Sequence, residues 1–213
     1  MVRSSLRPRV SRGAQDGVHA TRYNGRVTIE QAAYQVRFDW GRAGLDAIGA
    51  DADVVVWVDA IPPPLELPPP ELAPGSAGAV IETDVRTSAA AARWLLALQE
   101  RLARRITIAV VAAGEPRPDG SIRWAVEDHL AAGSVISHLG AAGIDATSPE
   151  AATVEAAYRQ LERALGHLVS AGVTGRAAAV RPASFRVDEE LGAAAVVVRR
   201  SHPDAEPPVV SPA

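Results

Sequence analysis

The chain has 213 residues, of which 47% are hydrophobic, and a formal net charge of −3 at pH 7. It contains no cysteine and no lysine, which excludes disulfides, thiolate nucleophiles, Cys-ligated metals and Schiff-base lysines. The length suits a single domain with a substantial core. Because there is no basic excess and no apolar run near the ~20 residues of a membrane span, we expect a cytoplasmic protein that binds neither nucleic acid nor membrane.

The first third of the chain predicts an unstructured arm followed by the start of an α/β pattern. Arginines scattered among Ser, Pro and Gly predict a disordered basic arm at 1–28. Alternating apolar and polar side chains then predict a half-buried strand at 34–38, and a short helix is expected at 42–48. The apolar segment 53–59 is typical of a central parallel strand, and it ends in Asp59.

A proline-rich stretch at 61–78 interrupts this pattern. It contains two Pro triplets, and proline lacks the N–H that a helix or an inner strand needs, so we expect a surface loop. A spacer is one interpretation, and a ligand for a proline-reading partner is the other. A short strand at 79–82 and an amphipathic helix at 88–104 should follow.

The segment around 106–121 organises the second half of the chain. A buried strand at 106–112 ends in a Gly-Glu turn, and a second turn leads to Ser121, which is predicted to cap a helix at 122–139. Ser148, followed by Pro and Glu, predicts the start of another helix, which continues to about residue 172.

The remaining chain predicts a short helix within 173–181, a last strand at 193–198 and a disordered tail at 201–213. The alternation of strands and helices predicts a three-layer α/β/α fold with a mainly parallel or mixed central sheet. We therefore expect one domain at 29–200, interrupted by the proline-rich loop.

Four carboxylates are expected where strands end and a helix begins, namely Asp59, Glu115, Glu127 and Asp128. In open α/β sheets, ligands bind beyond the carboxyl ends of the strands. A site of oxygen ligands without cysteine suits Mg²⁺, which with arginine side chains can stabilise a transferring phosphoryl group. The alternative is that these are ordinary solvated acids, since acids also suit a helix N-terminus.

Several segments of the sequence together resemble the 2-phosphosulfolactate phosphatase family. They include Tyr34-Gln35-Val36-Arg37-Phe38-Asp39-Trp40-Gly41, Ala52 to Asp59, Val111-Ala112-Ala113-Gly114-Glu115, Pro118-Asp119-Gly120-Ser121, Val126-Glu127-Asp128 and Ser148-Pro149-Glu150-Ala151. The resemblance covers about 31–60 and 79–200, and the chain looks like a shortened member of the actinobacterial branch. The physiological substrate of that branch need not be the one that the family name describes.

This resemblance implies a Mg²⁺-dependent phosphatase that hydrolyses 2-phosphosulfolactate, an intermediate of coenzyme M biosynthesis, to sulfolactate and phosphate. Asp59 and Glu115 are then predicted as catalytic residues. With Glu127 and Asp128 they are also predicted as metal ligands. Substrate contacts are predicted for three further residues, Arg37, Arg117 and Ser121.

The chain departs from the family after Asp59, where Ala60-Ile61-Pro62-Pro63-Pro64 replaces a turn rich in Arg, Ser and Thr. The family's middle section, with its Thr-Asn-Gly-Thr-like loop, has no counterpart. The alternative function is therefore a catalytically inactive relative that acts as a binding or assembly protein. A homodimer is also expected, because loss of the middle section would expose apolar surface.

Overall fold

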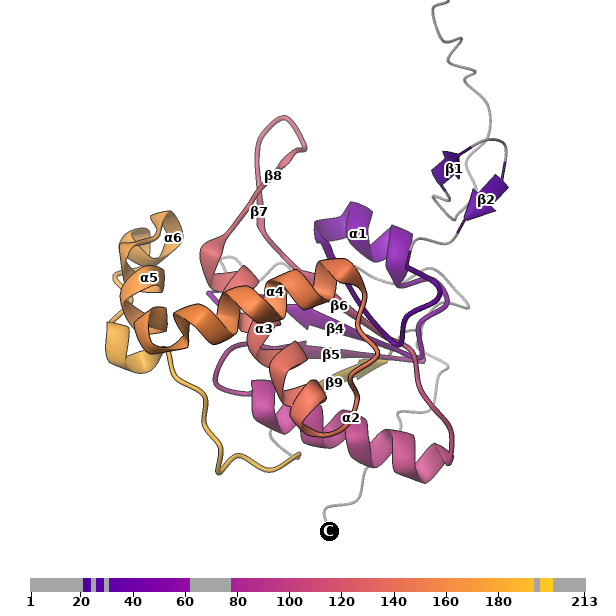
Figure 1. Ribbon diagram of the computed structural model, residues 1–213. Helices are drawn as coiled ribbons and strands as arrows, with labels where there is room; N and C mark the ends of the chain where they lie inside the picture. The colour runs from indigo at the N-terminus through magenta and orange to yellow at the C-terminus, as the bar shows by residue number, and fades with distance from the viewer. Residues whose placement is uncertain (1–20, 24–25, 29–30, 62–77, 194–195, 201–213) are drawn as a thin grey trace, which may run out of the picture.

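A five-stranded sheet lies at the centre of the protein in the computed structural model, which describes residues 21–23, 26–28, 31–61, 78–193 and 196–200 (Figure 1). The strand order is β3-β6-β4-β5-β9; the first four strands run parallel, and β9 runs antiparallel to β5. The strands are β3 Val36–Trp40, β4 Val54–Val58, β5 Ala79–Thr83, β6 Ile108–Ala112 and β9 Val197–Arg200. The four parallel strands therefore present their carboxyl ends at one edge of the sheet.

Helices cover both faces of this sheet, because successive strand side chains point to opposite sides. Val54 and Val56 belong to the apolar cluster under α2, α3 and α4, whereas Val55 packs in a second cluster with Leu45 and Ile48 of α1. The helices are α1 Gly41–Ile48, α2 Ser88–Leu102, α3 Val126–Ala141 and α4 Pro149–Leu161. The prediction of a three-layer α/β/α fold with a mainly parallel sheet is confirmed.

The C-terminal elements pack beside the end of α4 (Figure 1). They are the 3-10 turn η1 Glu162–Ala164, α5 Leu165–Ala171, α6 Val173–Ala177 and the 3-10 turn η2 Pro182–Ser184. Ser148 caps α4 as predicted, and its Oγ accepts the N–H of Ala151 at 3.1 Å. The helix predicted from Ser148 to about residue 172 is divided by η1, yet Val154 of α4 and Val169 of α5 still share one buried cluster.

The helix predicted at 122–139 is present, but the prediction that Ser121 caps its start is wrong. A hairpin of β7 (Glu115–Pro116) and β8 (Ile122–Arg123) occupies this stretch, and α3 begins only at Val126. The turn is closed locally, because the Asp119 carboxylate accepts both the N–H and the hydroxyl of Ser121. The Ser121 hydroxyl therefore stabilises a turn. Serine is common both in turns and at helix caps, and the sequence pattern does not distinguish these two roles.

Parts of the predicted arm, loop and tail lie outside the described residues, namely 1–20, 24–25, 62–77 and 201–213. Within the arm, the described residues pair as two short antiparallel strands, β1 Thr21–Tyr23 and β2 Arg26–Thr28, so this part of the arm is not unstructured as predicted. None of the described helices is long and apolar enough to cross a membrane.

Gly133 allows α3 and α4 to pack closely, because a Cβ there would lie 2.5 Å from the Val154 carbonyl oxygen and 2.6 Å from the Tyr158 Cβ. We expect Gly133→Ala to lower the free energy of unfolding by about 2 kcal/mol through overpacking. Gly140→Ala in the same helix is the control, because its Cβ would meet only the Glu155 Oε1 at 4.0 Å. It should be neutral or stabilising by about 0.5 kcal/mol. Equal effects of both variants in urea unfolding would contradict this packing argument.

Candidate functional site

A group of buried and partly buried carboxylates lies at the carboxyl edge of the sheet, between the ends of β4 and β6 and the start of α3. Asp59 directly follows β4, while Glu127 and Asp128 lie in the first turn of α3. Glu127 is 2% exposed and Asp128 is 3% exposed. We call these three residues the carboxylate cluster. The structure thus places them at the edge where open α/β sheets bind ligands.

Asp128 joins the two strand ends to the helix. Its Oδ1 accepts the N–H of Ala60 after β4, and its Oδ2 accepts the N–H of Gly114 after β6, both at 2.9 Å. Burial raises the pKa of Asp128 to about 8, with smaller contributions from the charges of Asp59 and Glu127, while the two N–H groups act in the opposite direction. Asp128 is therefore a positioning residue for the backbone beside Asp59.

The surroundings of Asp59 disfavour the charged form of its side chain. Burial first, and the charges of nearby acids in addition, raise the pKa of Asp59 to about 6, while a hydrogen bond from the N–H of Ile61 acts in the opposite direction. Two of those acids, Glu127 and Glu115, were predicted site residues, and the third, Glu82, was not. Glu82 lies on β5 opposite Trp57 of β4, so only the strand order reveals that it adjoins Asp59.

Glu127 has a buried oxygen, Oε2, without a hydrogen-bond partner among the described residues. Within the same part of the chain, no arginine or histidine forms an ion pair with any member of the carboxylate cluster. Buried polar atoms are normally paired, so an unpaired carboxylate oxygen beside two further carboxylates is consistent with a cation site. Hard oxygen donors of this kind suit Mg²⁺, which needs only one or two carboxylates and keeps several waters.

The contacts of Glu115 differ from those expected for its predicted role as a metal ligand. Its Oε2 lies 2.7 Å from the Arg123 Nη2, and its Oε1 accepts the Thr174 hydroxyl at 2.6 Å. The Thr174 hydrogen bond first, and Arg123 second, lower the pKa of Glu115. In the described residues no group of three or more His, Asp or Glu side chains is arranged to hold a metal ion, so the four predicted ligands do not form one ligand set.

The three predicted substrate contacts do not lie together. Arg117 and Ser121 are exposed on the β7–β8 hairpin, which rises from the carboxyl edge (Figure 1). Arg37 instead lies near the amino end of β3, buried to 2% exposure, where it pairs with Asp51 and donates to the Ile48 carbonyl. The predicted place of Arg37 beside the acids is wrong, because a two-residue alternation does not show towards which end of the sheet a long side chain reaches.

Arg37→Met tests this structural role. The variant leaves Asp51, whose side chain is 39% exposed, without its partner, and we expect a loss of about 2 kcal/mol of unfolding free energy. Phosphate release per folded molecule should not change. Arg159→Met is the control, since the Arg159 side chain is exposed and its i,i+4 pair with Glu155 should contribute less than about 0.5 kcal/mol. A higher KM in Arg37→Met would instead restore a role in substrate binding.

An aromatic platform, made of Trp40, Trp124 and His129, adjoins the carboxylate cluster and was not predicted. The His129 ring stacks on Trp40 at 5.9 Å and an interplanar angle of 7°, and Trp124 lies 5.0 Å from His129 on a tilted plane. Burial lowers the pKa of His129, which favours the neutral ring. The sequence signal was the position of the two tryptophans, one at the end of a strand and one just before a helix.

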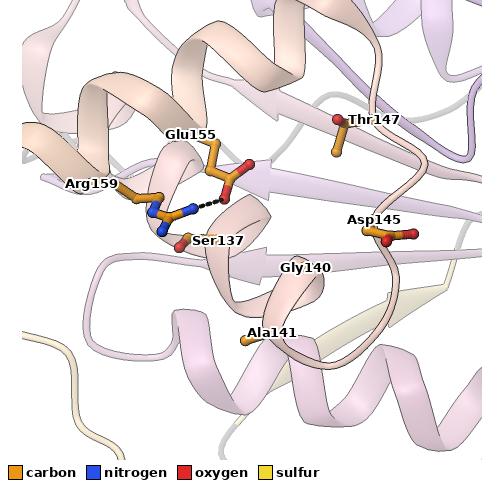
Figure 2. A pocket seen from close by; sticks show the side chains of 7 residues that line it. All are labelled: Ser137, Gly140, Ala141, Asp145, Thr147, Glu155 and Arg159. Carbon is orange, nitrogen blue, oxygen red and sulfur yellow. Dashed lines mark ion pairs between the residues drawn. The ribbon is translucent and has the colours of Figure 1, made fainter.

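A separate groove of about 450 Å³ lies at the other end of α3, between its last turn, the following loop and α4. Figure 2 shows its polar lining, including the Glu155–Arg159 ion pair and the loop residues Asp145 and Thr147. Thr147 is bridged to Val36 at the amino end of β3, so the groove is on the side of the sheet away from the carboxylate cluster. None of the predicted site residues lines it.

Comparison with known proteins leaves the family open. No family model, no curated protein and no solved structure matches this chain. The resemblance to the phosphatases stays a prediction that depends on sequence motifs, and the site has to be interpreted from its own geometry.

Proposed function

We propose that the chain is a Mg²⁺-dependent phosphatase that acts on a small phosphomonoester, such as 2-phosphosulfolactate, at the carboxylate cluster. The observation that carries the proposal is the Glu127 Oε2, which is buried next to Asp59 at the carboxyl edge of the sheet and has no hydrogen-bond partner among the described residues. A bound cation would relieve the repulsion among these acids. The proposal includes a cytoplasmic location and a homodimer.

Asp59 and Glu127 are the residues that would hold the cation, because within the described part of the chain Asp128 already accepts two backbone hydrogen bonds, whereas the Glu127 Oε2 has no partner. Bound Mg²⁺ would polarise a phosphoryl oxygen and offset the negative charge of the phosphate. Asp128 keeps the backbone of Ala60 and Gly114 in place through two hydrogen bonds, so it fixes the position of Asp59 without touching substrate.

The β7–β8 hairpin is the proposed substrate-side wall. Glu115, paired with Arg123 and bonded to Thr174, fastens the base of the hairpin to α6, so its proposed role is positioning. Arg117, which is exposed on the hairpin, is the proposed contact for a second acidic group of the substrate. The sulfonated substrate itself is supported by the sequence resemblance alone.

The test is phosphate release from 2-phosphosulfolactate and from glycerol phosphate by the full chain, with Mg²⁺, with EDTA, and with Mg²⁺ restored after EDTA. We expect release that disappears in EDTA and returns with the cation, because the carboxylates alone repel the phosphate. Equal rates with and without EDTA would contradict the metal. No release from well-folded protein in any condition would contradict the phosphatase.

A catalytically inactive relative that acts as a binding or assembly protein is the second candidate. It is favoured by the observation that the described residues form no group of three metal ligands. Under this alternative, folded protein binds Mg²⁺ no more tightly than an Asp59→Asn variant in isothermal titration. Tighter cation binding by the native chain, together with metal-dependent phosphate release, would exclude it.

A further inference from the structure

Trp124 presents a flat, half-exposed ring at the carboxyl edge of the sheet. It is 53% exposed although its neighbours in the aromatic platform, Trp40 and His129, are more enclosed. The ring centroids of Trp40 and Trp124 lie 6.0 Å apart, and His129 contacts both rings. A tryptophan side chain can bury 150–250 Å², so roughly half of that contact area remains open to a ligand.

The platform is rigid, because the hairpin that carries Trp124 is fixed on two sides. Ile122 packs against Gly41 and Gly114, where a Cβ would lie 1.8 Å from the Ile122 Cδ1 and 2.4 Å from its Cγ2 respectively. On the other side Arg123 pairs with Glu115 and donates to Thr174. The exposed part of Trp124 is therefore held in place before a ligand arrives, which lowers the entropy cost of binding.

The platform and the carboxylate cluster share one piece of backbone. The Trp40 Cε3 lies 3.5 Å from the position that a Cβ of Gly114 would occupy, and the N–H of Gly114 donates to the Asp128 carboxylate. His129 follows Asp128 directly in α3. A molecule whose phosphate lies at the carboxylates thus has an aromatic surface as the neighbouring wall.

We infer that Trp124 binds the organic part of the substrate by stacking, and that the substrate class is a phosphomonoester whose alcohol carries a planar aromatic ring. The inference depends on the proposed phosphatase site for the position of the phosphate. It departs from 2-phosphosulfolactate, which has no ring to stack. Offset or edge-to-face ring pairs stabilise a complex beyond the effect of area burial, so a planar ring is preferred over a saturated one of the same size.

The test compares benzyl phosphate with cyclohexylmethyl phosphate, which have similar leaving groups and similar size but differ in planarity. With Mg²⁺ and the full chain, Trp124→Ala should lower kcat/KM for benzyl phosphate about fivefold more than it lowers kcat/KM for cyclohexylmethyl phosphate, which loses only the area burial. Trp124→Phe should recover most of the loss, because it restores a flat ring. Tyr34→Ala is the matched control, since Tyr34 is an exposed aromatic residue, at 38%, that precedes β3 at the amino edge.

A binding measurement separates failure of this inference from failure of the proposed function. Benzylphosphonate, which is not hydrolysed, is titrated with Mg²⁺ into the native chain and into Trp124→Ala by calorimetry. Weaker binding by the variant supports the platform even where no phosphate release is detected. Equal losses of kcat/KM for both esters, or equal affinity of both chains for benzylphosphonate, would overturn the stacking role. Mg²⁺-dependent phosphate release in the same experiments would leave the proposed phosphatase intact.

Discussion

Asp59→Asn is expected to lower metal-dependent phosphate release at least about a hundredfold and, at the same time, to stabilise the fold above pH 6. The activity falls because the amide removes one of the two carboxylates proposed to hold the cation beside the phosphate. Stability rises because the same substitution removes a partly buried charge that is repelled by its acidic neighbours. A residue with a purely structural role would not combine a loss of phosphate release with a gain in stability.

The pH dependence of the stability follows from the direction in which the pKa of Asp59 is shifted. The pKa of Asp59 has its ordinary value of 3.8 when the chain is unfolded, and burial raises this pKa to about 6 when the chain is folded. The folded chain therefore binds the proton more tightly, and the native protein loses stability as pH rises from about 4 to 6. After allowance for solvent screening, the loss is about 2 kcal/mol. Asp59→Asn should lack this loss.

Urea unfolding at pH 5 and pH 8, in EDTA so that no cation compensates, measures the effect. The gain of Asp59→Asn over the native chain should be larger at pH 8 than at pH 5. Asp145→Asn serves as the control, because Asp145 is an exposed carboxylate away from the cluster, and its substitution should have no such dependence. A variant that is inactive and equally destabilised at both pH values would indicate a purely structural role for Asp59.

The sequence was sufficient to predict the central strands and most helices, because their signals are local. The apolar runs that became β4 and β6 and the acids that end or follow them depend only on neighbouring residues, and parallel pairing then brings their carboxyl ends to one edge. The cap at Ser148 is equally local. These features place Asp59, Glu127 and Asp128 together without knowledge of the tertiary contacts.

What could not be predicted depends on contacts between distant segments. The hairpin exists because Ile122 packs against Gly41, about eighty residues earlier in the chain, and because Arg123 meets Glu115 and Thr174. Neither contact leaves a periodic signal in the sequence. Glu82 likewise lies near Asp59 only because β4 pairs with β5, and these two strands are separated in the sequence by the proline-rich segment.

Asp128→Ala should have the largest effect on the fold among the site variants, a loss of about 3 kcal/mol at pH 5. The substitution leaves the N–H groups of Ala60 and Gly114 without their acceptor beside a buried helix start, and each unpaired buried donor costs about 1–3 kcal/mol. Asp128→Asn keeps one acceptor oxygen and should lose less. Asp119→Ala is the matched control, since Asp119 also accepts two hydrogen bonds but is exposed.

The cost of Asp128→Ala should also depend on pH with a definite sign. Because burial raises the pKa of Asp128 to about 8, the native chain loses stability as the pH rises from about 4 to 8. The alanine variant lacks this carboxyl group and should not lose stability in this way. The destabilisation measured in EDTA should therefore be smaller at pH 8 than at pH 5. Activity per folded molecule should fall as well, because Ala60 no longer fixes the position of Asp59. A cost that grows with pH would mean that the two N–H groups hold Asp128 ionised, and that it contributes to the site as a charge.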